Sequence, residues 1–261
     1  MGLTLAVSSV FYVLMARAGG LTAGGAALVP WLMWTPGLVA VALQLRFRRS
    51  LAGLGWSAGK TRYWIAGYFV PIAYSLVVYA LIWASPLGDF DLTALDRLRE
   101  RWPLLFLGSL QSCLFALGEE IGWRGYLVPR LARLLDFDGV ALTSGLIWAL
   151  WHAPLVLFAG YRSEAPVGYS LLCFTLLAVG ASYLYAWIRL KSGSLWPAVL
   201  LHGSHNLWVQ GFFDRATLDT GPTEYWSGEF GAGLAAAAIV IALVTRRLAR
   251  GMDLPRRQPT A

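Results

Sequence analysis

The residues best able to do chemistry in this chain are a few polar side chains inside apolar segments. Glu119 and Glu120 end one apolar run, and Arg124 follows them within the same predicted helix. An Asp, Lys or Arg at the centre of a membrane-spanning helix costs roughly 2.5 to 3.5 kcal/mol, so such residues usually mark function or buried pairing. Neighbours on a helix diverge by about 100°, whereas residues four apart share a face. We therefore expect Glu120 to pair with Arg124 and Glu119 to face elsewhere.

Two other apolar segments carry imidazole and amide groups. One contains His152, and the other contains His202 and Asn206, whose spacing of four residues lets both point into one site. A carboxylate with a histidine can activate water as a general base. A histidine with an amide can donate hydrogen bonds to the oxyanion of a tetrahedral intermediate. With Glu119, these residues predict amide hydrolysis that needs no serine or cysteine nucleophile.

Each of these motifs also has a purely structural interpretation. The acid pair with Arg124 could be a solvated helix end at the membrane boundary. His152 could bond a neighbouring carbonyl group, and the pair of His202 and Asn206 could be a polar clasp between helices.

The elements that position these residues are expected to be membrane helices. The 261 residues are 57% hydrophobic and only 13% charged, and the mean hydropathy is +0.58. Because soluble domains carry about 25% charged residues, we predict an integral membrane protein. A single transmembrane domain over residues 1–261 accounts for the length, and no stretch is long enough for a separate soluble domain. The two cysteines, Cys113 and Cys173, lie in apolar runs and indicate no metal or redox motif.

Eight apolar segments are long enough, or nearly so, to cross a bilayer, which takes about 20 residues. They are Leu3–Ala16, Ala26–Leu45, Tyr63–Ala84, Pro103–Leu127, Val140–Ala159, Tyr169–Leu190, Leu195–Phe213 and Phe230–Thr245. The fold class we expect is all-α, a polytopic membrane helix bundle with about eight transmembrane helices. The first segment lacks a basic n-region, which favours a retained span over a cleaved signal.

The charges indicate how the bundle is oriented. Alternate connections between the segments hold 15 of the 21 basic residues, and the remaining connections hold 6. The positive-inside rule then places both termini in the cytoplasm, and in the inner membrane if the protein is bacterial. The same distribution accounts for the net charge of +7 without a nucleic-acid partner. Glu119, His152 and His202 would then meet in the cytoplasmic half of the bilayer.

Three motifs in order resemble those of the CPBP intramembrane proteases, the CAAX protease or ABI family that includes the Rce1-type CaaX prenyl protease. They are Glu119-Glu120-x-x-x-Arg124, Trp148-x-x-x-His152 and His202-x-x-x-Asn206. Their placement on the fourth, fifth and seventh predicted spans also matches. Trp148 stands where the family often has Phe. The resemblance covers roughly residues 103–213, the motif-bearing core.

The resemblance implies a glutamate-type intramembrane endopeptidase that acts on a membrane-associated or lipidated protein. By position, Glu119 and His152 would activate water, and His202 and Asn206 would stabilise the oxyanion. Glu120, held by Arg124, would support them. The expected partners are a membrane protein or peptide substrate and the lipid bilayer.

Alternatives remain open both for the cofactor and for the function. The family has also been described as metallopeptidases, and Glu119, His152 and His202 would suit zinc with an open position. None of the motifs is the HExxH zinc signature, so we favour a site without metal. A non-proteolytic family member would act as a membrane scaffold or bacteriocin-immunity protein. A transporter with a proton relay is the third class, but the sequence shows no inverted repeat to support it.

Overall fold

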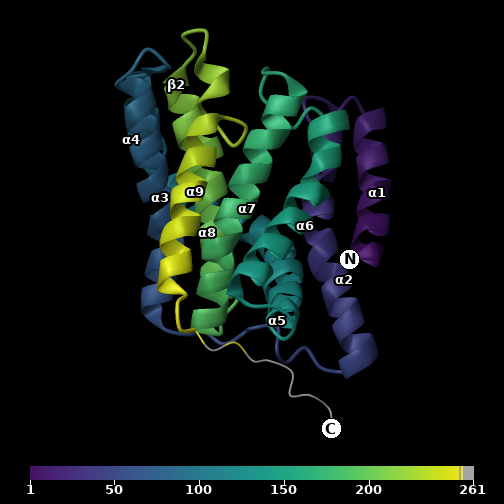
Figure 1. Cartoon of the computed structure of the whole chain (residues 1–261). Helices are drawn as coiled ribbons and strands as arrows, with labels where there is room; N and C mark the ends of the chain where they lie inside the picture. Colours follow the sequence, from purple (N-terminus) through teal and green to yellow (C-terminus); the bar gives the residue numbers. More distant parts are fainter. Residues whose placement is uncertain (253, 255–261) are drawn as a thin grey trace.

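The apolar segments of the chain form long helices that stand side by side in one bundle (Figure 1). The computed structural model describes residues 1–252 and 254. The helices are α1 (Gly2–Arg17), α2 (Val29–Arg48), α3 (Thr61–Trp83), α4 (Thr93–Glu120), α5 (Val128–Leu131), α6 (Phe137–Phe158), α7 (Val167–Ser192), α8 (Trp196–His205) and α9 (Ala232–Leu248). Two π-helical segments continue α4 and α8 without a break, η2 (Ile121–Leu127) and η3 (Asn206–Phe213).

The connections are short and add little to the bundle. The connections include the 3-10 turns η1 (Gly24–Leu28), η4 (Asp214–Ala216) and η5 (Thr223–Tyr225). The strands β1 (Asp89–Phe90) and β2 (Thr217–Leu218) pair antiparallel at one end of the bundle, above α3 and α8 in Figure 1. The predicted all-α membrane bundle is therefore confirmed.

The predicted number of spans needs a correction. Every predicted segment coincides with a helix, but among residues 1–252 and 254 only five helices are long and apolar enough to cross a membrane. These are Gly24–Arg48, Thr61–Trp83, Thr93–Leu131, Phe137–Phe158 and Val167–Ser192. Helix α1 has 16 residues and α9 has 17. At about 1.5 Å per residue, both are shorter than the roughly 30 Å of a hydrocarbon core. The seventh segment changes from α8 to a π-helix at Asn206.

The outer surface of the bundle is apolar. Phe106 on α4 is 74% exposed, Leu150 on α6 is 67% exposed and Leu81 on α3 is 66% exposed. Soluble monomers rarely expose contiguous apolar surface of this kind. These side chains therefore face lipid, and the few polar residues are left to the interior.

Helix α8 lies at the centre of the bundle and packs against α3, α4 and α7. Glycines allow the closest approaches beside the polar residues. A Cβ atom at Gly203 would lie 2.6 Å from the Sγ atom of Cys113 on α4, and one at Gly118 would lie 2.7 Å from the Cα atom of Trp34 on α2. Small residues at such crossings let helix backbones come together in membranes. They bring the acidic end of α4 against α2 and α8.

The orientation of the bundle in the membrane stays a prediction. Two of the basic residues counted toward it, Arg256 and Arg257, lie outside the described residues, as does the C-terminal residue. Of the 15 basic residues in the basic-rich connections, Arg124 is instead buried inside η2. The other described ones lie at the start of α3 and at the ends of α2, α5, α7 and α9, and these ends are at the lower end of the bundle in Figure 1.

Candidate active site

The acid pair lies at the C-terminal end of α4 and is buried. Glu119 is 1% exposed and Glu120 is 0% exposed. Because they are helix neighbours, the two carboxylates take different partners. Glu119 accepts hydrogen bonds from two indoles, and Glu120 accepts from a guanidinium and an imidazole. The solvated helix end, which was the structural alternative for this motif, does not occur.

Glu120, Arg124 and His202 form one buried ionic unit. The Nη1 atom of Arg124 donates to Oε1 of Glu120 at 2.9 Å, so the expected ion pair is present. The Nδ1 atom of His202 lies 2.9 Å from the same oxygen. A carboxylate oxygen can only accept, so Nδ1 of His202 carries the hydrogen. Its Nε2 atom is left for the cavity.

Two aromatic rings lie against the guanidinium of Arg124. Its Cζ atom lies 3.9 Å from the ring centre of Tyr185 and 4.6 Å from that of Trp148. Such cation–π contacts stabilise a desolvated guanidinium by about 2 kcal/mol or more. In addition, Arg189 donates from Nε to the carbonyl oxygen of Arg124 at 2.9 Å. Side chains of α6 and α7 therefore hold Arg124 in place, in addition to the ion pair within its own helix, which α4 and η2 form together.

Glu119 is held by tryptophans through one of its two oxygens. The indole N–H of Trp148 donates to Oε2 at 2.9 Å, and that of Trp123 donates to the same atom at 3.2 Å. The other oxygen has no protein donor among the described residues. A phenylalanine at position 148 could not donate the shorter of these bonds. The tryptophan at position 148, where the resembling family often has Phe, therefore helps to hold the Glu119 carboxylate.

His152 presents one nitrogen to the same space. Its Nδ1 atom lies 3.0 Å from the carbonyl oxygen of Trp148, one turn earlier on α6. Because that carbonyl can only accept, Nδ1 carries the hydrogen and Nε2 keeps a lone pair. The carbonyl bond was the structural alternative for His152. Here it also sets the tautomer that a general base needs.

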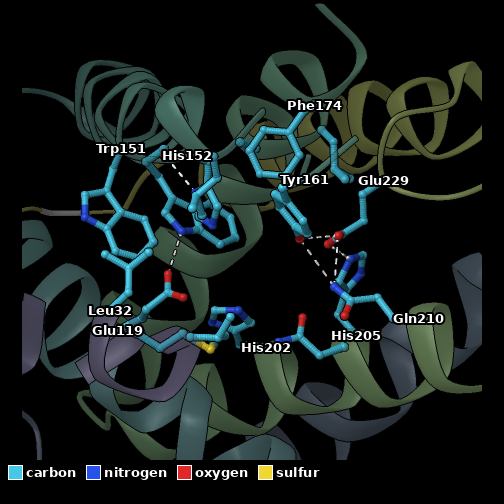
Figure 2. A pocket seen from close by; sticks show the side chains of 18 of the residues that line it. Leu32, Glu119, Trp151, His152, Tyr161, Phe174, His202, His205, Gln210 and Glu229 are labelled. Carbon is cyan, nitrogen blue, oxygen red and sulfur yellow. Dashed lines mark hydrogen bonds and ion pairs between the residues drawn. The ribbon is translucent and has the colours of Figure 1, made fainter. Parts of the chain in front are cut away.

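All four predicted catalytic residues line one cavity of about 140 Å³. They are Glu119, His152, His202 and Asn206. Figure 2 shows Glu119 and His202 along one wall with His152 above them. A cavity needs only about 10–15 Å³ of this measure to hold one water molecule. This one has room for water beside the groups that would activate it.

The cavity has a second polar wall that the sequence analysis did not predict. Glu229, in the loop before α9, accepts from Tyr161 at 2.5 Å and from Gln210 at 2.9 Å on Oε2. The Nε2 atom of His205 lies 3.0 Å from its Oε1, and the hydroxyl of Tyr74 meets the Nδ1 atom of His205. Figure 2 places this group across the cavity from Glu119. The sequence feature that came closest to indicating this second wall is His205, which lies between the predicted oxyanion residues His202 and Asn206.

The alternative zinc ligands, Glu119, His152 and His202, are not gathered into a metal-binding group in this structure. Among residues 1–252 and 254, no three His, Cys, Asp or Glu side chains lie close enough together to hold one. The chemistry proposed below therefore uses the side chains alone.

The segment that carries the three motifs matches a known family. Residues 101–208 match the family described as Type II CAAX prenyl endopeptidase Rce1-like. The resemblance expected from the motifs is therefore confirmed over this segment, which makes up about two fifths of the chain. The chain is also similar to a CAAX prenyl protease 2 from Methanococcus maripaludis, with 32% identity over 111 residues. The alignment covers 40% of this chain and 39% of the relative, so the chain matches about two fifths of that protein's length.

The Glu229 network predicts a dependence of stability on one carboxylate. Burial raises the pKa of Glu229, but the hydrogen bond and charge of His205 and the bond from Tyr161 outweigh it and lower that pKa to about 2. We expect Glu229→Gln to reduce the free energy of unfolding by about 1–3 kcal/mol, because buried donors lose a charged acceptor. Thermal unfolding in detergent measures this change, with the exposed Glu164→Gln as a control that should change little.

The pH dependence of that difference follows from the sign of the shift. The pKa of Glu229 in the folded protein lies below its unfolded value of 4.5. The carboxylate therefore contributes its full stabilisation above about pH 4.5 and loses it as the pH falls toward about 2. The gap between wild type and Glu229→Gln should therefore shrink as the pH falls through this window. A gap that is constant or widens on acidification would contradict the network.

Proposed function

We propose that the chain is an intramembrane endopeptidase, in which water activated by Glu119 and His152 attacks a peptide bond. The observation that carries this proposal is the convergence of Glu119, His152, His202 and Asn206 on one buried cavity. One oxygen of Glu119 and the Nε2 atoms of both histidines have no protein partner among the described residues. The match of residues 101–208 to a prenyl endopeptidase family supports the same reaction class.

In the first step the general base accepts a proton from water. Glu119 or His152 takes this proton while the water oxygen bonds to the carbonyl carbon of the substrate. General-base assistance of this kind is worth roughly 10²- to 10⁴-fold in rate. The two indole donors on Oε2 keep Glu119 in place and direct its free oxygen to the cavity.

In the second step the oxyanion receives hydrogen bonds. The amide of Asn206 makes no hydrogen bond to a described residue, and the residue lines the cavity. His202 would donate from Nε2 when protonated, and its hydrogen bond to Glu120 favours that state. With Arg124 positive and both glutamates negative, a protonated His202 brings the formal charge of the group to zero. The tetrahedral intermediate then collapses, and the proton held by the base passes to the leaving amine.

The proposed substrate is a membrane-associated or lipidated protein. The relative's name includes prenyl protease. The cavity here has apolar walls, among them Leu32, Leu155 and Phe174. We propose residues 103–213 as the catalytic core and a multi-pass membrane location with both termini on the cytoplasmic side.

Loss of the Glu119 carboxylate should slow cleavage strongly without unfolding the protein. We expect Glu119→Gln to lower kcat by roughly 10²- to 10⁴-fold. The assay is hydrolysis of a fluorogenic peptide that carries an isoprenylated cysteine and a short apolar C-terminal tail, in lipid nanodiscs. Glu100→Gln, an exposed glutamate on the same helix, is the matched control. Full turnover by Glu119→Gln would remove the assigned role, whereas an inactive wild type with a lipid-dependent binding partner would favour the scaffold or immunity alternative.

Removal of the oxyanion donor should act on the transition state more than on binding. We expect Asn206→Ala to lower kcat by roughly 10²- to 10³-fold with little change in KM, because the bond forms only as charge develops. Gln111→Ala, an exposed amide on α4, should retain normal kinetics. An increase in KM at constant kcat would assign Asn206 to substrate binding instead.

Catalysis should not need a metal ion. We expect activity to persist after dialysis against a chelator, because the proposed steps use only side chains of this chain. Metal analysis of the purified protein is the companion measurement. Stoichiometric zinc that is lost in His152→Ala or His202→Ala would overturn the metal-free mechanism.

A further inference from the structure

A second, basic hollow shares no residue with the cavity of the candidate active site. It has a volume of about 340 Å³ and lies where the C-terminal end of α2 meets α5. Arg48, Arg130 and Arg133 line it, together with Gln44 and the turn after α2. The proposed reaction uses none of these residues.

Arg130 is fixed in place before any ligand binds. Its Nη1 atom donates to the carbonyl oxygen of Tyr126 at 2.8 Å, and its Nη2 atom donates to Oε1 of Gln44 at 2.7 Å. The amide of Gln44 is itself oriented, since its Nε2 atom donates to the carbonyl oxygen of Ala52 at 2.8 Å. The guanidinium also lies over the Tyr126 ring, 3.3 Å from its centre. A guanidinium has five N–H donors, so three remain for a ligand.

The hollow lacks a protein anion among the described residues. The other exposed ion pairs show the usual arrangement, with Arg97 beside Asp91 and Arg246 beside Asp138. No carboxylate of residues 1–252 and 254 lies within ion-pair distance of Arg48, Arg130 or Arg133. Like charges that share a hollow repel one another, and a bound anion relieves that repulsion.

The surroundings of the hollow favour a lipid over a soluble anion. Leu45 and Phe47 on α2 and Leu134 after α5 are exposed apolar side chains beside the arginines in sequence. Basic pockets between membrane helices bind lipid headgroups, and arginine matches phosphate oxygens with paired N–H donors. We propose that this hollow binds the phosphate headgroup of an anionic phospholipid, whose acyl chains lie against the apolar side chains of α2.

This proposal does not depend on the proteolytic function. The hollow and the candidate active site nevertheless share one continuous helix, because α4, η2 and α5 follow one another without a break from Glu119 to Arg130. A lipid phosphate bound by both Arg48 and Arg130 would link the C-terminal end of this continuous helix to α2.

Native mass spectrometry of the full chain in a neutral detergent tests the proposal. The probes are phosphatidylglycerol and phosphatidylcholine with identical acyl chains. We expect preferential binding of phosphatidylglycerol, weakened about 30-fold in the double variant Arg48→Gln with Arg133→Gln, at about 1 kcal/mol for each arginine removed. Arg130 is kept because it also holds Gln44 and Tyr126.

The matched control removes two positive charges elsewhere at the same end of the bundle. Lys60 and Lys191 are exposed, and no described residue accepts a hydrogen bond from either side chain. Lys60→Gln with Lys191→Gln should leave phosphatidylglycerol binding within about twofold of wild type. Equal binding of the two lipids, or an equal loss in the lysine control, would overturn the proposal. Displacement of the lipid by inorganic phosphate at similar concentration would also overturn it and identify a site for soluble phosphate.

Discussion

The buried charge of Glu120 is the constraint on which the rest of the site depends. A carboxylate that is 0% exposed inside an apolar bundle is tolerated only when a cation and hydrogen bonds compensate it. Arg124 supplies the cation from η2, one turn further along the same continuous helix. His202 on α8 supplies a second hydrogen-bond donor. Removal of one partner from such a pair typically costs 3–5 kcal/mol. The relative placement of α4 and α8 therefore follows from this carboxylate.

That constraint also determines what Glu119 does. Since Glu120 faces Arg124 and α8, helix geometry turns Glu119 toward α6, where Trp148 donates to it. The ring of Trp148 at the same time lies near Arg124 and beside the imidazoles of His152 and His202, at 5.7 and 5.5 Å between ring centres. One aromatic side chain thus contacts members of all three motifs. Its indole N–H supplies Glu119 with a hydrogen bond that a phenylalanine at this position could not donate.

The sequence predicts those parts of the molecule that depend on local spacing. The helices follow from apolar runs, and the Glu120–Arg124 pair follows from a spacing of four residues on one helix. The number of full-length spans was overestimated because the prediction accepted two short segments, of 14 and 16 residues, and a seventh segment interrupted by His202, His205 and Asn206. The bond between His202 and Glu120 joins residues 82 apart in the chain, so no periodicity contains it. Glu229 was missed because it lies in a loop, where a charged residue normally faces water.

Hydrogen-bond capacity distinguishes the three buried glutamates as possible bases. Both oxygens of Glu229 already accept bonds, from His205 on one side and from Tyr161 and Gln210 on the other. Glu120 has a free oxygen, but that atom is sealed from solvent and the residue does not line the cavity. Glu119 combines a cavity position with an oxygen that no described donor uses. A water molecule in the cavity can therefore be bound by Glu119 without the loss of an existing contact. Either of the other carboxylates would first have to give up a partner or move.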